Sequence, residues 1–286
     1  MNQVASTSKS LLRLQSLYKS LSRAEQKVAD AVFADVKGSV YSSVTDLSEK
    51  ADVGETTVIR FCRKLGFRGF QEFKLALAQE LTVPSENMHS ELSETDDADA
   101  ICKKMNAYSI RTLEQTVSLL DQRELEKAAD ALVKANRVFF FGVGSSGITA
   151  QDGKYRFMRL GFTADSASDS HVIAMNCSVV GKSDVVVAIS SSGSTKDLVD
   201  AIRIAKENGA YIICLTNHAR SPITSSADAI LLGSARESPL QGGAFASKLA
   251  QIHLLDIVST IVAIRMKEHS YPSIERTAKS VLDKLY

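Results

Sequence analysis

The sequence has no tryptophan and few prolines or cysteines, four of each in 286 residues. Its cysteines, at positions 62, 102, 177 and 214, lie far apart and form no CxxC pair. This spacing argues against both a disulfide framework and a zinc site, and it fits reduced thiols in a cytosol. We interpret the cysteines as small core residues and expect neither a bound metal nor a cofactor.

Long apolar runs are also missing. The first residues, MNQVASTSKSLLRLQ, hold no apolar run long enough for a signal peptide. The most apolar later stretch, residues 252–264, is interrupted by His253, Asp256 and Ser259. We therefore expect a soluble cytoplasmic chain with no segment that spans a membrane.

Charge is nearly balanced overall but unevenly distributed along the chain. The formal net charge is only +1, yet residues 60–74 carry five basic residues against one acid. Residues 82–100, TVPSENMHSELSETDDADA, carry six acids and no lysine or arginine. The latter composition is typical of a solvated linker. We expect two domains, residues 1–81 and 101–286, joined by an acidic linker at 82–100.

The first domain is expected to be all helical. Ser22 followed by Glu25 is a capping-box signature for a helix that runs to Phe33. A shorter helix follows from about residue 44 to 51, and a further helix from about 55 to 65 has one apolar side. Two short helices, a tight turn at 52–54 and a basic outward face predict a helix-turn-helix.

The outward face of the helix at 55–65 carries candidate DNA contacts. Thr56 and Thr57 stand at its start, where short side chains approach base edges closely. Arg60 and Arg63 follow within reach of bases or phosphates. The expected phosphate contacts, which add affinity without sequence information, are Lys64, Arg68 and Lys74. From charge and periodicity alone, a solvated basic face on an ordinary helix pair remains an equal alternative.

Residues 53–75, VGETTVIRFCRKLGFRGFQEFKL, resemble the signature of the RpiR family of bacterial transcriptional regulators. In that family a T-V-x-R-F-x-[RK]-x-L-G-[FY]-x-G-[FY] string spans the recognition helix and the following turn. The resemblance implies operator DNA as a partner. Gly54 stands where many relatives have serine, and a glycine cap costs only a few tenths of a kcal/mol.

In the second half, strands alternate with helices. Strands are expected at 138–141, 162–166, 184–189, 211–216 and 229–232, and helices at about 148–160, 196–208 and 246–266. This alternation predicts a doubly wound parallel sheet, an α/β sandwich with helices on both faces. The whole chain is thus expected to be α followed by α/β.

Two polar loops follow strands of this sheet: GVGSSG at 142–147 and SSSGST at 190–195. Together they suggest one phosphate held by helix N-termini and hydroxyl groups, with Gly193 letting the backbone turn tightly. Two alternatives stay open. GVGSSG with Asp165 fits a dinucleotide fingerprint, and serine-rich segments are also common as plain caps and turns.

Residues of about 125–265 resemble a sugar isomerase (SIS) domain, whose two loops bind the phosphate of a phosphosugar. The resemblance implies phosphosugar contacts from Ser145 or Ser146 and from Ser190, Ser191, Ser192 and Thr195. The order of the two domains is that of RpiR-type regulators. We therefore expect a transcriptional regulator that responds to a sugar phosphate.

A sugar-phosphate isomerase with an accessory helical domain is the alternative function. Isomerisation needs a base, for which Glu237 is a candidate, with His171 or His253 assisting. Glu237 is equally suited to binding sugar hydroxyls, and a tethered DNA-binding domain favours sensing over turnover. Because helix-turn-helix proteins usually read paired half-sites, we also expect a homodimer or homotetramer, with the helix at 246–266 as core or subunit contact.

Overall fold

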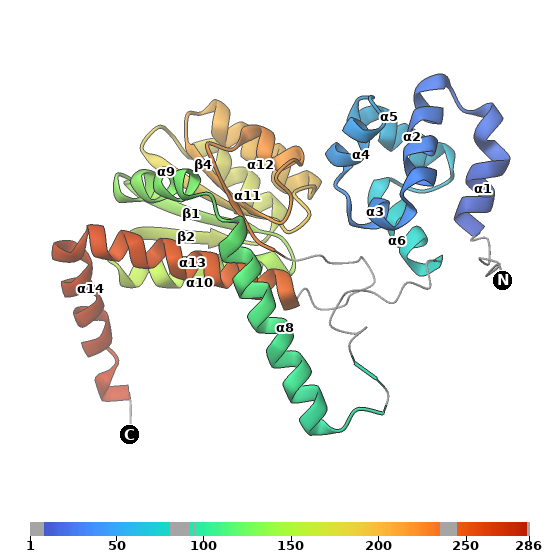
Figure 1. The fold of residues 1–286 in the computed structure, drawn as a ribbon. Helices are drawn as coiled ribbons and strands as arrows, with labels where there is room; N and C mark the ends of the chain where they lie inside the picture. The colour runs from blue at the N-terminus through green and yellow to red at the C-terminus, as the bar shows by residue number, and fades with distance from the viewer. Residues whose placement is uncertain (1–8, 81–91, 94, 235–244, 285–286) are drawn as a thin grey trace. The chain divides into compact units, whose positions relative to one another are not determined.

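The computed structural model describes residues 9–80, 92–93, 95–234 and 245–284 (Figure 1). The chain divides near residue 108 into two compact units. Each is described separately below. The expected linker at 82–100 lies mostly outside the described residues, but its last three positions, from Ala98 onward, are helical.

The first unit is a cluster of short helices. These are α1 (Lys9–Leu17), α2 (Arg23–Ala34), α3 (Val36–Tyr41), α4 (Val44–Lys50), α5 (Glu55–Lys64) and α6 (Phe70–Glu80). Ser22 and Glu25 form the expected capping box at the start of α2, and Ser43 with Asp46 forms a second one at α4. The helices enclose one apolar core, which includes Leu14, Val28, Leu47, Phe61 and Phe73.

The second unit contains a five-stranded parallel sheet, as the alternating pattern predicts. Its strands are β1 (Arg137–Gly142), β2 (Thr163–Ala167), β3 (Asp184–Ile189), β4 (Tyr211–Thr216) and β5 (Ala229–Leu232). The strands lie in the order β2-β1-β3-β4-β5. In open α/β sheets the ligand crevice lies outside the carboxyl ends of the strands at the point where the direction of winding reverses, which in this sheet is between β1 and β3.

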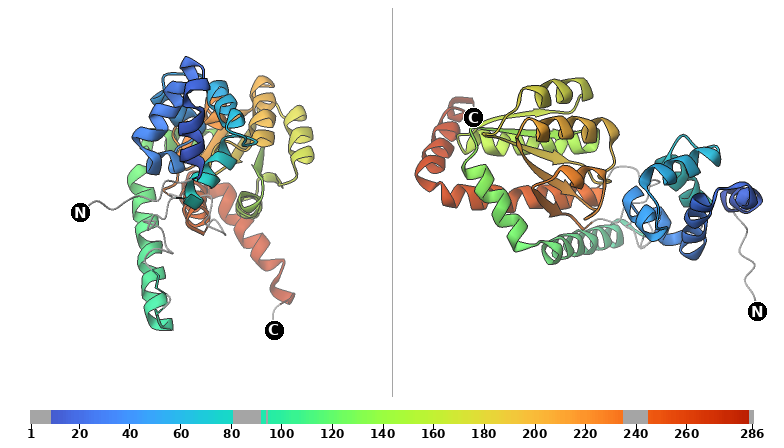
Figure 2. Two further views of the ribbon diagram at one scale, coloured as in Figure 1. Left: turned by 90° about the vertical axis from the view of Figure 1, so that its right-hand side faces the viewer. Right: turned by 90° about the horizontal axis from the view of Figure 1, so that it is seen from above.

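Helices cover both faces of this sheet, so the doubly wound expectation is confirmed (Figures 1 and 2). The core on one face is shared with α9 (Gln122–Val133), α10 (Ser145–Arg159) and α13 (Phe245–Arg265). On the other face it is shared with α11 (Ser170–Val179) and α12 (Lys196–Glu207). Two helices lie at the ends of the unit, α8 (Ala98–Leu119), which crosses the division between the units, and α14 (Lys267–Lys279).

The register of β1 and β3 is fixed at their amino ends by an ion pair. Arg137 and Asp184 stand opposite each other in the sheet, and two hydrogen bonds of 2.9 and 2.6 Å join the guanidinium to the carboxylate. The same register sets Gly142 opposite Ile189. The first and second polar loops consequently leave the sheet side by side.

One helix of the described residues, Ala246–Arg265, is long and apolar enough to cross a membrane. In the structure its residues Ala250, Leu254 and Val258 are buried against the sheet side of the unit. The core helix of a soluble domain satisfies the same criteria of length and composition. We therefore assign the buried side of this helix to the core, which is one of the two roles that the sequence left open.

Candidate DNA-binding and phosphate-binding sites

Helix α5 has the geometry of a recognition helix. It follows α4 after a turn in which Asp52 adopts a positive φ of 51°, and Gly54 caps it without a side-chain hydrogen bond. Thr56, Arg60 and Arg63 are exposed. These three residues therefore lie on the exposed face of α5, as their spacing predicts.

Thr57 is not part of that surface. Its side chain is buried, and its Oγ1 accepts a hydrogen bond of 3.3 Å from the Arg60 guanidinium. The helical spacing places Thr57 beside Val58 and one turn before Phe61, so the packing of α5 against its neighbours encloses it. This burial does not fit the expected contact of Thr57 with base edges, and its hydroxyl contacts Arg60 instead.

The expected phosphate contacts also differ from one another. Arg68 is exposed, although its Nε lies 3.3 Å from Glu72 Oε1. Lys64 is exposed but its Nζ donates to the carbonyl of Ser20 at 2.7 Å and lies 3.1 Å from Glu25.

Lys74 is an interior residue and cannot contact a phosphate in this conformation. Its Nζ donates to the carbonyl of Ser42 at 2.7 Å and lies 5.5 Å from the Phe70 ring centroid. Burial lowers the pKa of Lys74 to about 8, while Asp46 acts in the opposite direction. The expectation of a phosphate contact at Lys74 was wrong.

The first polar loop, residues 142–147, turns directly into α10. Gly144 caps that helix with φ of 63° and ψ of −129°, which favours glycine. Ser145 and Ser146 are thus the first residues of α10, three positions earlier than the expected start. The backbone amides of a helix's first turn lack intrahelical acceptors, so this end of α10 is suited to an anion.

The second polar loop, residues 190–195, connects β3 to α12 and is held internally. Ser190 Oγ lies 3.3 Å from Thr195 Oγ1, and Thr195 caps α12 with its side chain free of a cap hydrogen bond. The Ser192 hydroxyl accepts a hydrogen bond from the Ser194 amide at 3.3 Å. We call the two loops together, residues 142–147 and 190–195, the serine cradle.

Gly193 is required by the conformation of the second loop. Its φ is 61°, and a Cβ atom there would lie 2.0 Å from the Ser221 hydroxyl oxygen. Any other residue would clash with the segment after β4. Glycine therefore lets the second loop pack closely against the segment that contains Ser221, in agreement with the tight turn that the sequence predicts at Gly193.

Several polar residues around the serine cradle escape sequence reasoning. Gln251 of α13 and Thr149 of α10 are buried and hydrogen-bonded to each other at 3.1 Å. Asn217, after β4, donates to the Ser247 hydroxyl at 2.7 Å. A polar residue inside an apolar helix, as Gln251 is in LAQIHLLDIV, is the one signal that could have identified them.

The dinucleotide alternative receives little support from the sheet. Its strand order, 2-1-3-4-5, differs from the order 3-2-1-4-5-6 of dinucleotide-binding domains. The carboxylate of Asp165, on β2, is ion-paired with Lys154 at 2.7 Å. These features assign the GVGSSG loop to a different α/β fold from the one its fingerprint suggests.

The candidate catalytic residues are not brought together among the described residues. Glu237 lies outside the described residues. His171 occupies the first turn of α11, where Asp169 caps the helix, and His253 lies on α13. No group of three or more His, Cys, Asp or Glu that could hold a metal is found in the part of the chain that the structure describes.

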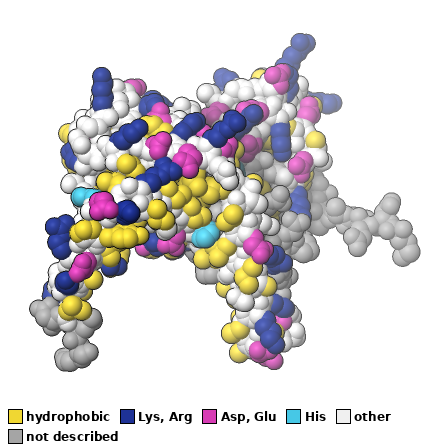
Figure 3. Space-filling model, turned by 60° about the vertical axis from the view of Figure 1, so that its left-hand side comes forward, with side chains coloured by type: hydrophobic (Ala, Val, Ile, Leu, Met, Phe, Trp, Pro, Cys, Tyr) yellow, Lys and Arg dark blue, Asp and Glu magenta, His cyan; other side chains and the backbone are white. Residues whose placement is uncertain are grey.

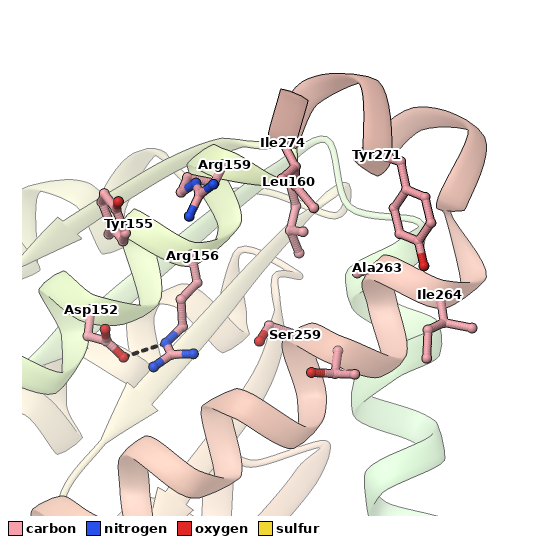
Figure 4. A pocket seen from close by; sticks show the side chains of 11 residues that line it. Asp152, Tyr155, Arg156, Arg159, Leu160, Ser259, Ala263, Ile264, Tyr271 and Ile274 are labelled. Carbon is pink, nitrogen blue, oxygen red and sulfur yellow. Dashed lines mark hydrogen bonds and ion pairs between the residues drawn. The ribbon is translucent and has the colours of Figure 1, made fainter. Parts of the chain in front are cut away.

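A separate groove of about 510 Å³ lies on the second unit between α10, α13 and α14 (Figure 4). Tyr155 and Ile264 on its walls and Tyr271 at its end are more than half exposed. Arg156 is ion-paired with Asp152 of the same helix at 2.5 Å and with Asp256 of α13. Figure 3 shows apolar side chains gathered on the face from which α14 projects, with basic and acidic side chains among them.

Comparison with known proteins identifies both units. Residues 8–84 match the helix-turn-helix domain of the rpiR family, and residues 131–261 match the SIS domain. An uncharacterized HTH-type transcriptional regulator of Haemophilus influenzae is 35% identical over 277 residues, which are 96% of each chain. The chain belongs to the RpiR family. It is a transcriptional regulator with a DNA-binding helix-turn-helix domain and an SIS domain, as the two sequence resemblances imply.

Two further proteins are similar to this one over nearly the whole chain. HexR of Escherichia coli is 31% identical, covering 95% of this chain and 93% of its own. The structure of Vibrio vulnificus NanR complexed with ManNAc-6P is 30% identical, with a TM-score of 0.87 over 97% of this chain and 99% of NanR. The sugar isomerase domain of an RpiR transcription factor from Sphaerobacter thermophilus shares the fold alone, at 19% identity and a TM-score of 0.56.

Proposed function

We propose that this RpiR-family regulator binds a sugar phosphate in the serine cradle and that binding changes its affinity for operator DNA. One observation carries the proposal: two serine-containing loops end on neighbouring helix N-termini at the β1/β3 crevice. Hydroxyl groups and first-turn amides together supply the several donors that a phosphate monoester requires. The similarity to NanR, whose structure holds ManNAc-6P, supports the same reading.

The phosphate contacts that we propose come from both loops of the cradle. They are Ser145, Ser146, Ser190, Ser191, Ser192, Gly193 and Thr195, with Glu237 reserved for sugar hydroxyls. Ser146 and Ser190 are buried while Ser145 is exposed. We therefore expect the phosphate to enter from the side of Ser145, with the sugar extending outward from the cradle on that side.

For DNA, we propose base or phosphate contacts from Thr56, Arg60 and Arg63 at the free face of α5. Lys64 and Arg68 would add phosphate contacts after releasing their acidic partners. The exchange is cheap at Arg68, whose side chain is 91% exposed, because exposed ion pairs contribute little to stability. It costs more at Lys64, because the Glu25 side chain is only 12% exposed. We place the DNA-binding domain at residues 1–81 and the ligand-binding domain at 101–286.

We infer that the regulator senses its sugar phosphate without converting it. The inference rests on the DNA-binding domain attached to the same chain, since a tethered helix-turn-helix favours reporting occupancy of the cradle over turnover. Occupancy of the cradle then acts as an allosteric signal through the segment that joins the domains. We expect the protein to act in the cytoplasm, where its DNA lies.

The groove between α10, α13 and α14 supports a homodimer. Reading two half-sites needs two copies of the chain, and a two-fold contact uses the same patch on both copies. The groove offers exposed apolar groups such as Ile264 and Tyr155 beside Arg156 and Asp152. Arg156 is already paired with Asp152 and Asp256 within one copy, so the contact that we propose between copies is mainly apolar.

Ligand binding is tested by a thermal-shift panel on the full chain. Sugar phosphates, including N-acetylmannosamine 6-phosphate, are compared with the free sugars, inorganic phosphate and NAD. A ligand at a hundred times its Kd stabilises its domain by about 2.7 kcal/mol. A shift by one phosphosugar and none by its free sugar is the expected result, and a shift by NAD alone would overturn the proposal.

DNA binding is tested by selecting sequences from a random library and then measuring affinity against salt. Arg60→Ala should weaken binding to the selected site roughly tenfold or more, and the wild-type affinity should fall steeply with salt. Arg123→Ala removes an exposed arginine of α9 in the second unit and should leave affinity unchanged. Equal affinity of wild type and the Arg60 variant would argue against α5 as the recognition helix.

A further inference from the structure

Gln251 is buried at the point where α13 passes the serine cradle. Its side chain is 2% exposed, and that of Thr149 on α10 is fully buried. Gln251 Oε1 accepts a hydrogen bond of 3.1 Å from Thr149 Oγ1. Its Nε2 donates a hydrogen bond of 3.1 Å to Ser191 Oγ. One amide therefore connects α10, the helix that begins in the first loop, to the second loop.

The backbone of Ser191 is held from the opposite side by the end of β4. Its carbonyl accepts hydrogen bonds from the backbone N–H of Asn217 at 3.1 Å and from Thr216 Oγ1 at 3.4 Å. With the backbone and one lone pair of the hydroxyl fixed, the remaining freedom of Ser191 is the direction of its O–H bond.

The hydrogen-bond inventory decides that direction. A serine hydroxyl has one donor and two acceptor positions. In the structure the Gln251 amide turns its oxygen toward the Thr149 hydroxyl and its nitrogen toward Ser191, so the Ser191 oxygen serves as an acceptor toward Gln251. Its proton is left for another acceptor. Ser191 is partly exposed while Gln251 and Thr149 are buried, so that acceptor comes from the open side of the cradle.

We propose that Gln251 is a positioning residue of the serine cradle, which holds the Ser191 hydroxyl as a donor to a bound phosphate oxygen. It acts through Ser191 and does not itself touch the phosphate. This inference rests on the proposed function, since it assigns a role within the same site. It predicts that loss of Gln251 weakens phosphate and phosphosugar binding by the same factor, because only the phosphate contact changes.

The test is a double-mutant cycle on the full chain. Calorimetry with inorganic phosphate and with N-acetylmannosamine 6-phosphate gives dissociation constants for wild type, Gln251→Met, Ser191→Ala and the double variant. Methionine keeps the length of the side chain but removes both hydrogen bonds. We expect Gln251→Met to raise the Kd for inorganic phosphate roughly five- to tenfold, the range of one hydrogen bond. In the Ser191→Ala background the same change should have no effect.

Three outcomes separate the possibilities. If wild type binds neither probe, the proposed function fails and the inference with it. If wild type binds phosphate and Gln251→Met binds it equally well, or if the two changes are additive in the cycle, the inference alone is overturned. Ser259→Ala, which removes another mostly buried hydroxyl of α13 away from the cradle, is the control and should bind as wild type.

A second variant protects the test against loss of folding in Gln251→Met. Thr149→Val keeps the shape of a fully buried side chain and removes only the donor to Gln251. The amide is then free to turn its oxygen toward Ser191, which would recruit the hydroxyl proton. The inference is supported if Thr149→Val binds phosphate more weakly than wild type at every pH between 6 and 8. It is contradicted if Thr149→Val binds phosphate as tightly as wild type.

Discussion

Individual residues differ in reactivity according to their burial, and the four cysteines show this most simply. Cys62, Cys177 and Cys214 are buried, and burial raises the pKa of each thiol to about 12. Cys102, on α8, is exposed. Since the thiolate is the reactive form, the buried thiols should be inert in the folded protein.

We therefore expect a thiol reagent such as Ellman's reagent to label one cysteine per chain at neutral pH, and all four after denaturation. Cys102→Ser should abolish labelling of the native protein. Labelling of the Cys102→Ser variant at the rate of a free thiol would show that one of the buried sites opens readily.

At the same scale, Gly193 decides whether the second loop can form. Gly193→Ala places a Cβ 2.0 Å from the Ser221 hydroxyl at a φ of 61°, and strain of this kind costs on the order of 1–3 kcal/mol. We expect a lower melting temperature and loss of the phosphosugar shift. Gly181→Ala is the matched control, because no atom lies within 4 Å of the position its Cβ would take. Equal ligand shifts in both variants would contradict the assigned role of this loop.

Among the elements, the contact between α6 and the junction of α3 with α4 contains a buried ammonium group. Lys74 is 5% exposed, and burial lowers its pKa to about 8. In an unfolded chain the pKa of a lysine is about 10.4. Between these two values the unfolded state binds more protons than the folded one, so the free energy of unfolding rises with pH. Below pH 8 both states are charged and the full cost of burial is present.

The first unit should consequently gain stability, on the order of 3 kcal/mol, as the pH rises from 8 to about 10.4. Lys74→Met should remove most of this gain, as measured by urea denaturation followed by circular dichroism at several pH values. Lys37→Met removes an exposed lysine of α3 and should keep the wild-type slope. An unchanged slope in Lys74→Met would show that another group controls it.

For the whole molecule, the groove between α10, α13 and α14 is the surface that we expect to join two copies. Ile264 is 60% exposed in this groove, while Val179, on α11, is 66% exposed outside it. Ile264→Glu should convert the dimer to monomers in light scattering, because a carboxylate is costly to bury at an apolar contact. Val179→Glu should leave the mass unchanged. The opposite pattern would move the interface to α11.

Much of this architecture could be predicted from the sequence because its signals are local. The strands at 184–189, 211–216 and 229–232 have the bounds that the sequence predicts. The capping box at Ser22 and the glycine cap at Gly54 fix helix starts by bonds that span only a few residues. The helix-turn-helix and the order of the two domains follow from motifs of the same local kind.

Other features depend on contacts between distant parts of the chain. The sequence predicts no helix after residue 266, because Pro272 argues against a helix interior. The structure nevertheless has α14 there, with Pro272 inside it. The sequence predicts Thr57 and Lys74 to lie at the surface, because helical spacing gives the direction of a side chain but not what that side chain meets. Packing against neighbouring helices encloses both.

The sequence by itself therefore determined the α plus α/β class, the strand positions and the two serine-containing loops, because each is written in adjacent residues. Only the tertiary structure decided which polar groups meet. Thr149 and Gln251 are 102 positions apart, and Gln251 lies 60 positions from Ser191. Their hydrogen bonds form because α10, α13 and the loop after β3 meet at one edge of the sheet. The separation of these residues in the sequence does not predict that contact.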